Sequence, residues 1–285
     1  MEILRRKTCK GRGRFLLLVL RTRLMKTVLR KLQRLFTPDK SVPPTSQPVP
    51  PVPLELVSEF VYNNYSFIIG GYINYFNELD EPMKRRFVDR VHHYRMSKTF
   101  HYVRLEEKEE IPVLVSASAV QVTFGLDNYL METFKDIHIL ADAYQMDSDK
   151  ELYIGHVAPE GIYLSWKHFL YGYAVSNDNI NVALHEMSHA LLYNNFFAPY
   201  GEDKEFRLNY EKFSTTTGPI IADVITRRRS YLRSYAYSNI HEFWAVSVEA
   251  FFESPEGLKM NMPQLYEALC KVLNQDPISR NKIIH

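Results

Sequence analysis

The chain has 285 residues, 46% of them hydrophobic and 24% charged, which is enough apolar material for one sizeable core. Its two cysteines, Cys9 and Cys270, exclude a disulfide-stabilised framework and favour a reducing compartment. The apolar run Phe15–Leu20 is far shorter than the roughly 20 residues of a membrane-spanning helix, and no signal-peptide cleavage pattern follows it, so we expect a cytoplasmic protein.

The first 40 residues are strongly basic, with 13 Lys and Arg against two acids (13 − 2 = +11), whereas the rest holds 22 against 31 (22 − 31 = −9). Residues 15–36 repeat leucine and valine at spacings of three and four, which predicts an amphipathic helix with a basic face. Residues 1–37 therefore form a basic arm. Its candidate partners are an anionic membrane surface, which would make the protein peripheral to the membrane, or another protein surface. A solvated arm without a partner is the alternative, and no specific nucleic-acid binding is predicted.

Residues 38–54 are rich in proline, which excludes a regular helix or a central strand and is typical of an extended linker. From residue 55 the composition is that of a globular protein and shows no internal repeat. We therefore expect one folded domain over residues 55–285.

Early in this domain, Glu81-Pro82 predicts the start of a helix, because proline suits the first helical turn. Residues 115–124 are interpreted as a short helix that ends at Gly125. Ile137–Leu140 is rich in β-branched residues and predicts a strand.

Leu152–Val157 and Gly161–Trp166 flank a Pro-Glu-Gly turn and predict a hairpin. The second of these strands is a candidate edge strand for an extended substrate, and an ordinary hairpin strand is the alternative. Thr215–Gly218 is interpreted as a loop, and two helices are expected near residues 179–195 and 239–253. Strands followed by helices predict an α+β domain with a small mixed sheet.

The helix near 179–195 contains a His-Glu-x-x-His motif. His185 and His189 are one turn apart on the same face, so both imidazoles can reach one Zn²⁺ ion. Glu186 follows the first histidine and can act as general base towards a water molecule. A chance motif is expected in about one in forty chains of this length, and two hydrogen-bonded core histidines are the structural alternative. The apolar residues that flank the motif favour the metal site.

The helix near 239–253 supplies the best candidate for a third ligand. Asn239 can cap this helix, and Glu242 lies three positions later, where a capping box would also place a glutamate. Glu249 lies two turns beyond Glu242 on the same face. This spacing suits one carboxylate that ligates the metal and a second that orients a ligand histidine.

The downstream string Tyr-x6-Glu-Phe-x-Ala-x3-Glu-x-Phe-Phe-Glu-x-Pro, together with the histidine motif, resembles the Mlc titration factor A family of zinc peptidases. That family is related to the catalytic domain of anthrax lethal factor, and the resemblance covers most of residues 72–277. It implies a zincin-like fold, with Glu242 as third zinc ligand and Tyr235 as the residue that stabilises the oxyanion. Tyr237 is the local rival of Tyr235. Several relatives have an aspartate where this chain has Leu192, so any role of that aspartate is absent here or passes to Glu249.

The resemblance and the motif together predict a zinc metallopeptidase that hydrolyses a peptide or protein substrate, and the relatives imply aminopeptidase-like action. The alternative is a regulatory binding protein that sequesters a partner, such as a transcriptional repressor, and makes little catalytic use of its zinc. The basic run Arg227–Arg229, with Arg233, is interpreted as a solvated surface rather than a site for an acidic substrate.

Overall fold

The computed structural model of the protein describes the residues 56–145, 152–175, 178–197, 202–227 and 231–279, together with Ile283. Side chains are described in these ranges except at 221–227. The chain divides into two units, Met1–Pro50 and Pro51–His285, and all described residues belong to the second. The predicted arm and proline-rich linker thus lie outside the described residues. Within the described ranges, no helix is both long enough and apolar enough to cross a bilayer.

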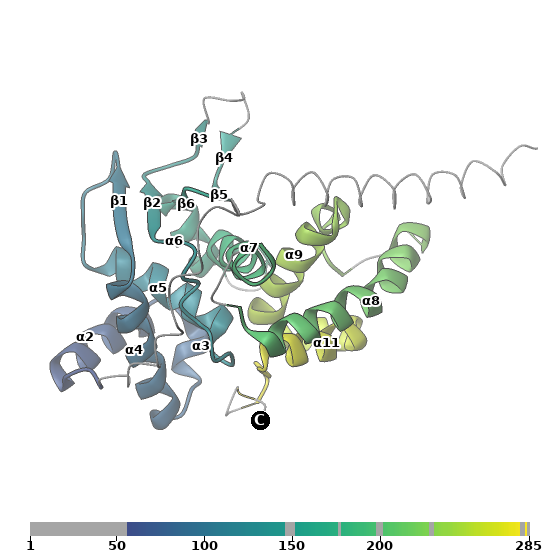
Figure 1. The fold of residues 1–285 in the computed structure, drawn as a ribbon, viewed down its shortest axis with the longest axis horizontal. Coiled ribbons are helices and arrows are strands. Elements are labelled where there is room, and N and C mark those ends of the chain that lie inside the picture. The colour runs from purple at the N-terminus through teal and green to yellow at the C-terminus, as the bar shows by residue number, and fades with distance from the viewer. Residues whose placement is uncertain are drawn as a thin grey trace, which may run out of the picture. The chain divides into compact units, whose positions relative to one another are not determined.

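A four-stranded mixed sheet lies along one side of the unit, in the order β1-β2-β6-β5 (Figure 1). Its strands are β1 (Thr99–Val103), β2 (Asp136–Leu140), β5 (Gly155–Ala158) and β6 (Gly161–Ser165). The strands β1, β2 and β6 are parallel, and β5 pairs antiparallel with β6. A separate two-stranded hairpin joins β3 (Tyr144–Gln145) to β4 (Leu152–Tyr153).

The predicted strand at 137–140 and the predicted hairpin are confirmed, with two corrections. The run 152–157 is interrupted at Ile154, because Leu152–Tyr153 pairs with β3 and only Gly155–Ala158 pairs with β6. Of the two alternatives for 161–166, the ordinary hairpin strand is right and the edge strand is wrong: among the described strands, β6 lies between β2 and β5, and β5 is at the edge. Ile162 and Leu164 of β6 are both fully buried, as expected for a strand in the interior of a sheet.

Helices surround and precede the sheet. The first four are α2 (Glu59–Gly70), α3 (Asn74–Asn77), α4 (Glu81–Met96) and α5 (Glu110–Thr123). The predicted start of α4 is confirmed, because the Asp80 carboxylate accepts a hydrogen bond from Met83 N at 2.9 Å. The expected order of strands before helices is wrong, since α2, α3 and α4 come before β1.

Helix α5 is the central helix of the unit and packs against both α4 and α7. It begins at Glu110, earlier than the predicted 115, and every residue from Ile111 to Thr123 is buried. A helix that is buried on all sides has no polar face, so its apolar residues show no 3.6-residue period that would indicate where it starts. This explains why the sequence located only its second half.

The remaining helical segments follow the sheet: α6 (Trp166–Ala174), α7 (Val182–Phe196), α8 (Lys204–Arg227), the 3-10 turn η1 (Ser234–Tyr237), α9 (Ile240–Glu253), α10 (Pro255–Asn261) and α11 (Pro263–Leu273). Helix α7 packs against α9 on one side and against β5 and β6 on another, while α8 packs along α11. The indole nitrogen of Trp244 in α9 donates a hydrogen bond to Ser188 O in α7 at 3.0 Å. The two helices that carry the predicted site residues are therefore joined in the core.

The prediction of a loop at Thr215–Gly218 is wrong, because these residues lie inside α8. The hydroxyl of Thr215 donates a hydrogen bond to Glu211 O, one turn earlier in the helix, at 2.9 Å. The helix is held by an apolar stripe of Phe206, Tyr210 and Phe213, all buried, at spacings of four and three. The packing of this stripe thus outweighs the weak preference of Thr215–Gly218 for a turn.

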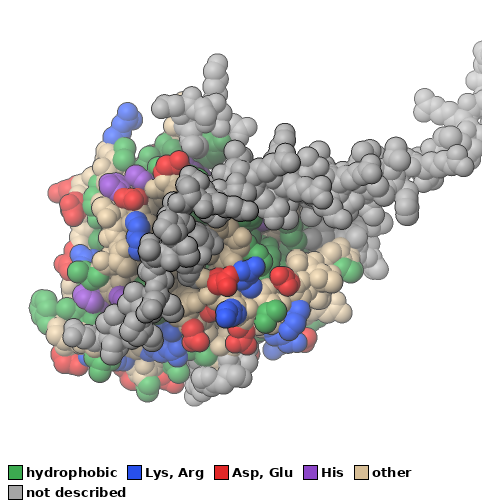
Figure 2. All heavy atoms as spheres, in the orientation of Figure 1, with side chains coloured by type: hydrophobic (Ala, Val, Ile, Leu, Met, Phe, Trp, Pro, Cys, Tyr) green, Lys and Arg blue, Asp and Glu red, His purple; other side chains and the backbone are tan. Residues whose placement is uncertain are grey.

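The α+β class with a small mixed sheet, predicted from the sequence, is confirmed. On the face seen in Figure 2, acidic and basic side chains are interspersed over the described surface. This visible part of the described surface therefore carries no large field of one sign.

Candidate metal centre

Helix α7 presents the two histidines of the motif on one face. Its first turn is fixed by Asn181, whose side-chain oxygen accepts a hydrogen bond from Leu184 N at 3.1 Å. His185 and His189 follow one turn apart, and their Nε2 atoms lie 3.1 Å from each other. His185 is buried, with 8% of its surface exposed.

Helix α9 brings a carboxylate to the same point. The Asn239 side chain accepts hydrogen bonds from His241 N at 2.9 Å and from Glu242 N at 3.0 Å, as the predicted cap requires. Glu242 Oε2 lies 3.2 Å from His185 Nε2 and 3.6 Å from His189 Nε2. The side chain of Glu242 is thus directed at the two imidazoles, the position that a third ligand would take.

The donor set fits a divalent metal ion. One ligand atom from each of His185, His189 and Glu242 lies within 4.8 Å of the other two, and no other such group occurs among the described residues. The Glu242 Oε2 atom is buried and has no hydrogen bond of acceptable geometry to the described protein, despite its short distance to the histidines. Two imidazole nitrogens and one glutamate oxygen are the ligands of many catalytic zinc sites.

Glu249 lies behind the first histidine, as the spacing on α9 predicts. Its carboxylate is 1% exposed, and its Oε1 lies 2.7 Å from His185 Nδ1. A hydrogen bond at Nδ1 leaves Nε2 as the atom of His185 that faces the ligand cluster.

The charges at the site favour a positive ion between these groups. Burial lowers the pKa of His185, but the carboxylates of Glu242 and Glu249 outweigh that effect and raise it to about 10. Burial raises the pKa of Glu242, yet the two histidines hold it well below its ordinary value. Both shifts show that a positive charge is stabilised at this point, whether it is a proton or a metal ion in its place.

Glu186 points away from the protein surface, towards the edge strand β5. It is 6% exposed, and a Cβ atom placed on Gly155 of β5 would lie 2.8 Å from its Oε1. Burial raises the pKa of this carboxyl above its ordinary value, while the nearby His185 and His189 oppose the rise. A carboxyl with a raised pKa exchanges a proton more readily near neutral pH, as a general base requires.

Tyr235 lies beside His185, one of the candidate metal ligands. Its ring centroid is 6.1 Å from that of His185, and half of its surface is exposed. Partial burial and the negative charge of Glu242 raise the pKa of Tyr235 to about 12, so its phenol keeps a proton to donate at neutral pH. Tyr237 packs instead against Phe243 in α9, with ring centroids 6.0 Å apart.

Three contributions to the site were not predicted from the sequence. Gly155 permits the close approach of Glu186, and Asn181 caps α7 while its backbone N–H donates to Glu249. Arg233, interpreted from the sequence as part of a solvated basic run, donates two hydrogen bonds to Glu249. That interpretation is wrong for Arg233; residues 228 and 229 of the run lie outside the described residues, as does the side chain of Arg227. Leu192, the residue at the position where several relatives have an aspartate, is buried in the hydrophobic core.

Comparison with known proteins agrees with this geometry. The model of the family described as glucose-regulated metallo-peptidase M90 matches residues 58–273, well over half of the chain. Two similar relatives are both named Mlc titration factor A, from Yersinia pestis (strain Pestoides F) and Yersinia pseudotuberculosis serotype O:1b (strain IP 31758). Each is 37% identical over 60 residues, which are 21% of this chain and 22% of the relative. The match thus spans about a fifth of the length of these relatives.

Proposed function

Because this chain belongs to the glucose-regulated metallo-peptidase M90 family, we propose that it is a zinc-dependent peptidase. The observation that supports this most directly is the convergence of His185, His189 and Glu242 next to the buried Glu186. The first three side chains would hold the ion. When bound, zinc supplies Lewis-acid chemistry that polarises a carbonyl group and makes water more acidic.

The residues of the chain supply the proton transfers and the hydrogen bonds. The Glu186 carboxylate takes a proton from the attacking water and delivers it to the departing amine. The phenol of Tyr235 donates a hydrogen bond to the oxygen that becomes negative as water adds to the carbonyl. Its high pKa supports this role, because a donor must keep its proton.

The substrate in this proposal is a peptide or protein segment bound in extended form along β5. This strand pairs with β6 on one side and has no further strand partner in the described part of the chain. Its Gly155 lies against Glu186, so a segment added to this edge would pass the general base. Aminopeptidase-like action is part of the proposal on the strength of the family resemblance alone.

The test combines metal content with turnover. Purified wild-type protein is expected to hold about one zinc per chain, and His185→Ala and Glu242→Ala are expected to lose it. Glu186→Gln should keep the metal but lose hydrolysis of casein and of a panel of aminoacyl-p-nitroanilides, because it removes the base and no ligand. Hydrolysis by Glu186→Gln at the wild-type rate would refute the mechanism.

A regulatory binding protein is the second candidate function, and the name of the Mlc titration factor A relatives favours it. In that case the chain would bind a protein partner, such as a transcriptional repressor, with equal affinity in wild type and Glu186→Gln. Loss of cellular function in Glu186→Gln with unchanged partner binding would argue for the peptidase.

For the rest of the chain we propose a basic arm at 1–37 and a linker at 38–54, joined to a metallopeptidase domain at 55–285. The arm would hold a cytoplasmic protein at an anionic membrane surface. Co-sedimentation of the full chain with phosphatidylserine vesicles but not with phosphatidylcholine vesicles, lost on deletion of 1–37, is the expected result.

A further inference from the structure

Arg233 connects three parts of the molecule that meet behind the candidate metal centre. Its guanidinium donates to both oxygens of Glu249, at 2.6 Å to Oε1 and 3.1 Å to Oε2. It also donates to Asn179 O, in the loop before α7, at 3.0 Å. The residue lies directly before η1, and the guanidinium carbon is 5.9 Å from the ring centroid of Tyr235.

Each oxygen of Glu249 has two partners. Oε1 accepts from Arg233 and lies 2.7 Å from His185 Nδ1, while Oε2 accepts from Arg233 and from Asn181 N at 2.7 Å. A carboxylate that is 1% exposed is stable only when its charge is paired and its lone pairs are satisfied. Arg233 supplies that pairing charge, and its planar fork matches the carboxylate in two places.

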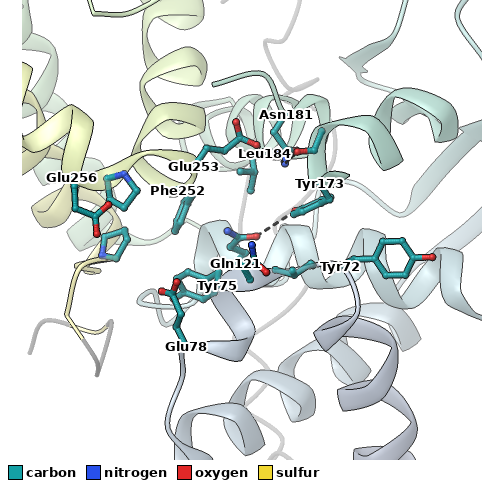
Figure 3. Close-up of a pocket in the computed structure, with 15 residues that line it drawn as sticks. Tyr72, Tyr75, Glu78, Gln121, Tyr173, Asn181, Leu184, Phe252, Glu253 and Glu256 are labelled. Atoms are coloured by element: carbon teal, nitrogen blue, oxygen red, sulfur yellow. Dashed lines mark hydrogen bonds between the residues drawn. The ribbon is translucent and has the colours of Figure 1, made fainter. Parts of the chain in front are cut away.

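The same contacts fix the start of α7. Over three consecutive residues of the entry loop, Asn179 O accepts from Arg233, Ile180 N donates to Glu253 at 3.1 Å, and Asn181 N donates to Glu249. The Asn181 side chain also donates to Glu253 at 3.2 Å, and both residues line a pocket together with Leu184 (Figure 3). The residue after Leu184 is His185, so a movement of this loop would move the first ligand.

We propose that Arg233 is a positioning residue of the metal centre. It holds Glu249 in one orientation, which fixes His185 with Nε2 towards the ligand cluster, and it anchors η1 so that Tyr235 lies beside His185. This inference rests on the proposed function, because it assigns a role towards the zinc ion. A purely structural role for Arg233 would stabilise the fold without affecting metal affinity.

The test measures zinc affinity by competition with a chromophoric chelator, in full-length wild type and in Arg233→Ala, Arg233→Lys, Glu249→Ala and the double variant Arg233→Ala/Glu249→Ala. Arg85→Ala is the matched control. Arg85 is 27% exposed against 29% for Arg233, and it likewise bonds a carboxylate and a backbone carbonyl, those of Glu59 and Val57, far from the site in the chain.

Arg233→Ala is expected to weaken zinc binding about tenfold, and Glu249→Ala by about 10- to 100-fold. The loss in the double variant should be clearly smaller than the sum of the two single losses, because Arg233 acts on His185 mainly through Glu249. Arg233→Lys should recover part of the loss, since it restores the charge but not the fork. Arg85→Ala should bind zinc like wild type. The absorption spectrum of the Co²⁺-substituted protein should change in Arg233→Ala, because the orientation of a ligand has changed.

The inference would be overturned if folded Arg233→Lys and Arg233→Ala had the zinc affinity and the Co²⁺ spectrum of wild type. It would also be overturned if the loss of zinc affinity in the double variant equalled the sum of the losses in the two single variants. If wild type binds zinc and His185→Ala does not, such a result leaves the proposed function intact. If wild type itself binds no zinc, both fail together.

Discussion

Replacement of Gly155 by alanine tests the placement of Glu186, the proposed general base, most directly. A Cβ atom on this residue would lie 2.7 Å from Glu186 Cγ, 2.8 Å from Glu186 Oε1 and 2.8 Å from Val182 Cγ2. Carbon atoms in contact lie about 3.5 Å apart, so the neighbours must yield by roughly 0.8 Å. Glu186 is 6% exposed, and its helix α7 packs against β5, so the clash falls on a buried side chain.

The expected effect on catalysis follows from this displacement. A misplacement of about 1 Å at a reacting group can reduce the rate of catalysis about 100-fold, so Gly155→Ala should lower kcat/KM by about 10- to 100-fold. Overpacking should also reduce the free energy of unfolding by about 1–3 kcal/mol. Zinc content should stay at the wild-type value, because Glu186 is not a ligand in the proposed site.

The assay is steady-state hydrolysis of a peptide substrate that wild type cleaves, with Glu186→Gln as the lower limit of activity. Gly218→Ala is the matched control: a Cβ there meets nothing within 4 Å, and alanine inside α8 should stabilise the helix by about 1 kcal/mol. Full activity in Gly155→Ala would refute the placement of Glu186 against β5. Loss of zinc in this variant would show that Gly155 supports the ligands rather than the base.

Three further outcomes are expected. Asn239→Ala removes the cap at the turn that carries Glu242, so the apo protein should lose about 1 kcal/mol in a denaturant titration and zinc affinity should fall; an unchanged midpoint would contradict this. Removal of zinc with EDTA should lower Tm in wild type but not in His185→Ala, since saturation at about 1,000 times Kd stabilises by about 4 kcal/mol. Burial, with the charge of Asp178 nearby, raises the pKa of Glu253 to about 8, so the native state binds more protons than the unfolded state and loses stability as pH rises towards 8. Glu253→Gln should therefore gain stability relative to wild type from pH 6 to 8, by at most about 1.4 kcal/mol per pH unit, and parallel pH profiles of the two proteins would contradict this.

The local features of the site were predicted from short stretches of sequence. His185 and His189 are one turn apart in any α-helix, and Asn239 caps α9 as its position before an apolar helix indicates. Spacing alone favoured Tyr235 over Tyr237, since Tyr235 lies seven residues before Glu242 as in the family's string, and the structure places Tyr235 next to His185. These predictions concern the helical period and capping, which depend on residues within one or two turns.

Errors in the predictions arose where contacts between distant residues decide the outcome. Whether β5 or β6 is the edge strand depends on the order in which strands pair, and that order is not encoded in the strands' own alternation. The central helix α5 was only half recognised because it is buried on all sides. In α8, packing of the aromatic stripe outweighs the turn preference of the Thr-rich stretch.

The sequence by itself determined the zinc-type motif, the two helices that carry the candidate site residues and the Asn239 cap of the second helix, because these follow from the backbone period and from nearby hydrogen bonds. Only the tertiary structure decided how these parts meet: Glu249 reaches His185 across 64 residues, and Arg233 reaches Glu249 from outside α9. A surface-like basic run and a buried salt bridge look the same in sequence. The difference appears only on folding, when the buried carboxylate of Glu249 comes to lie against Arg233. This contact connects the arginine to the candidate metal centre.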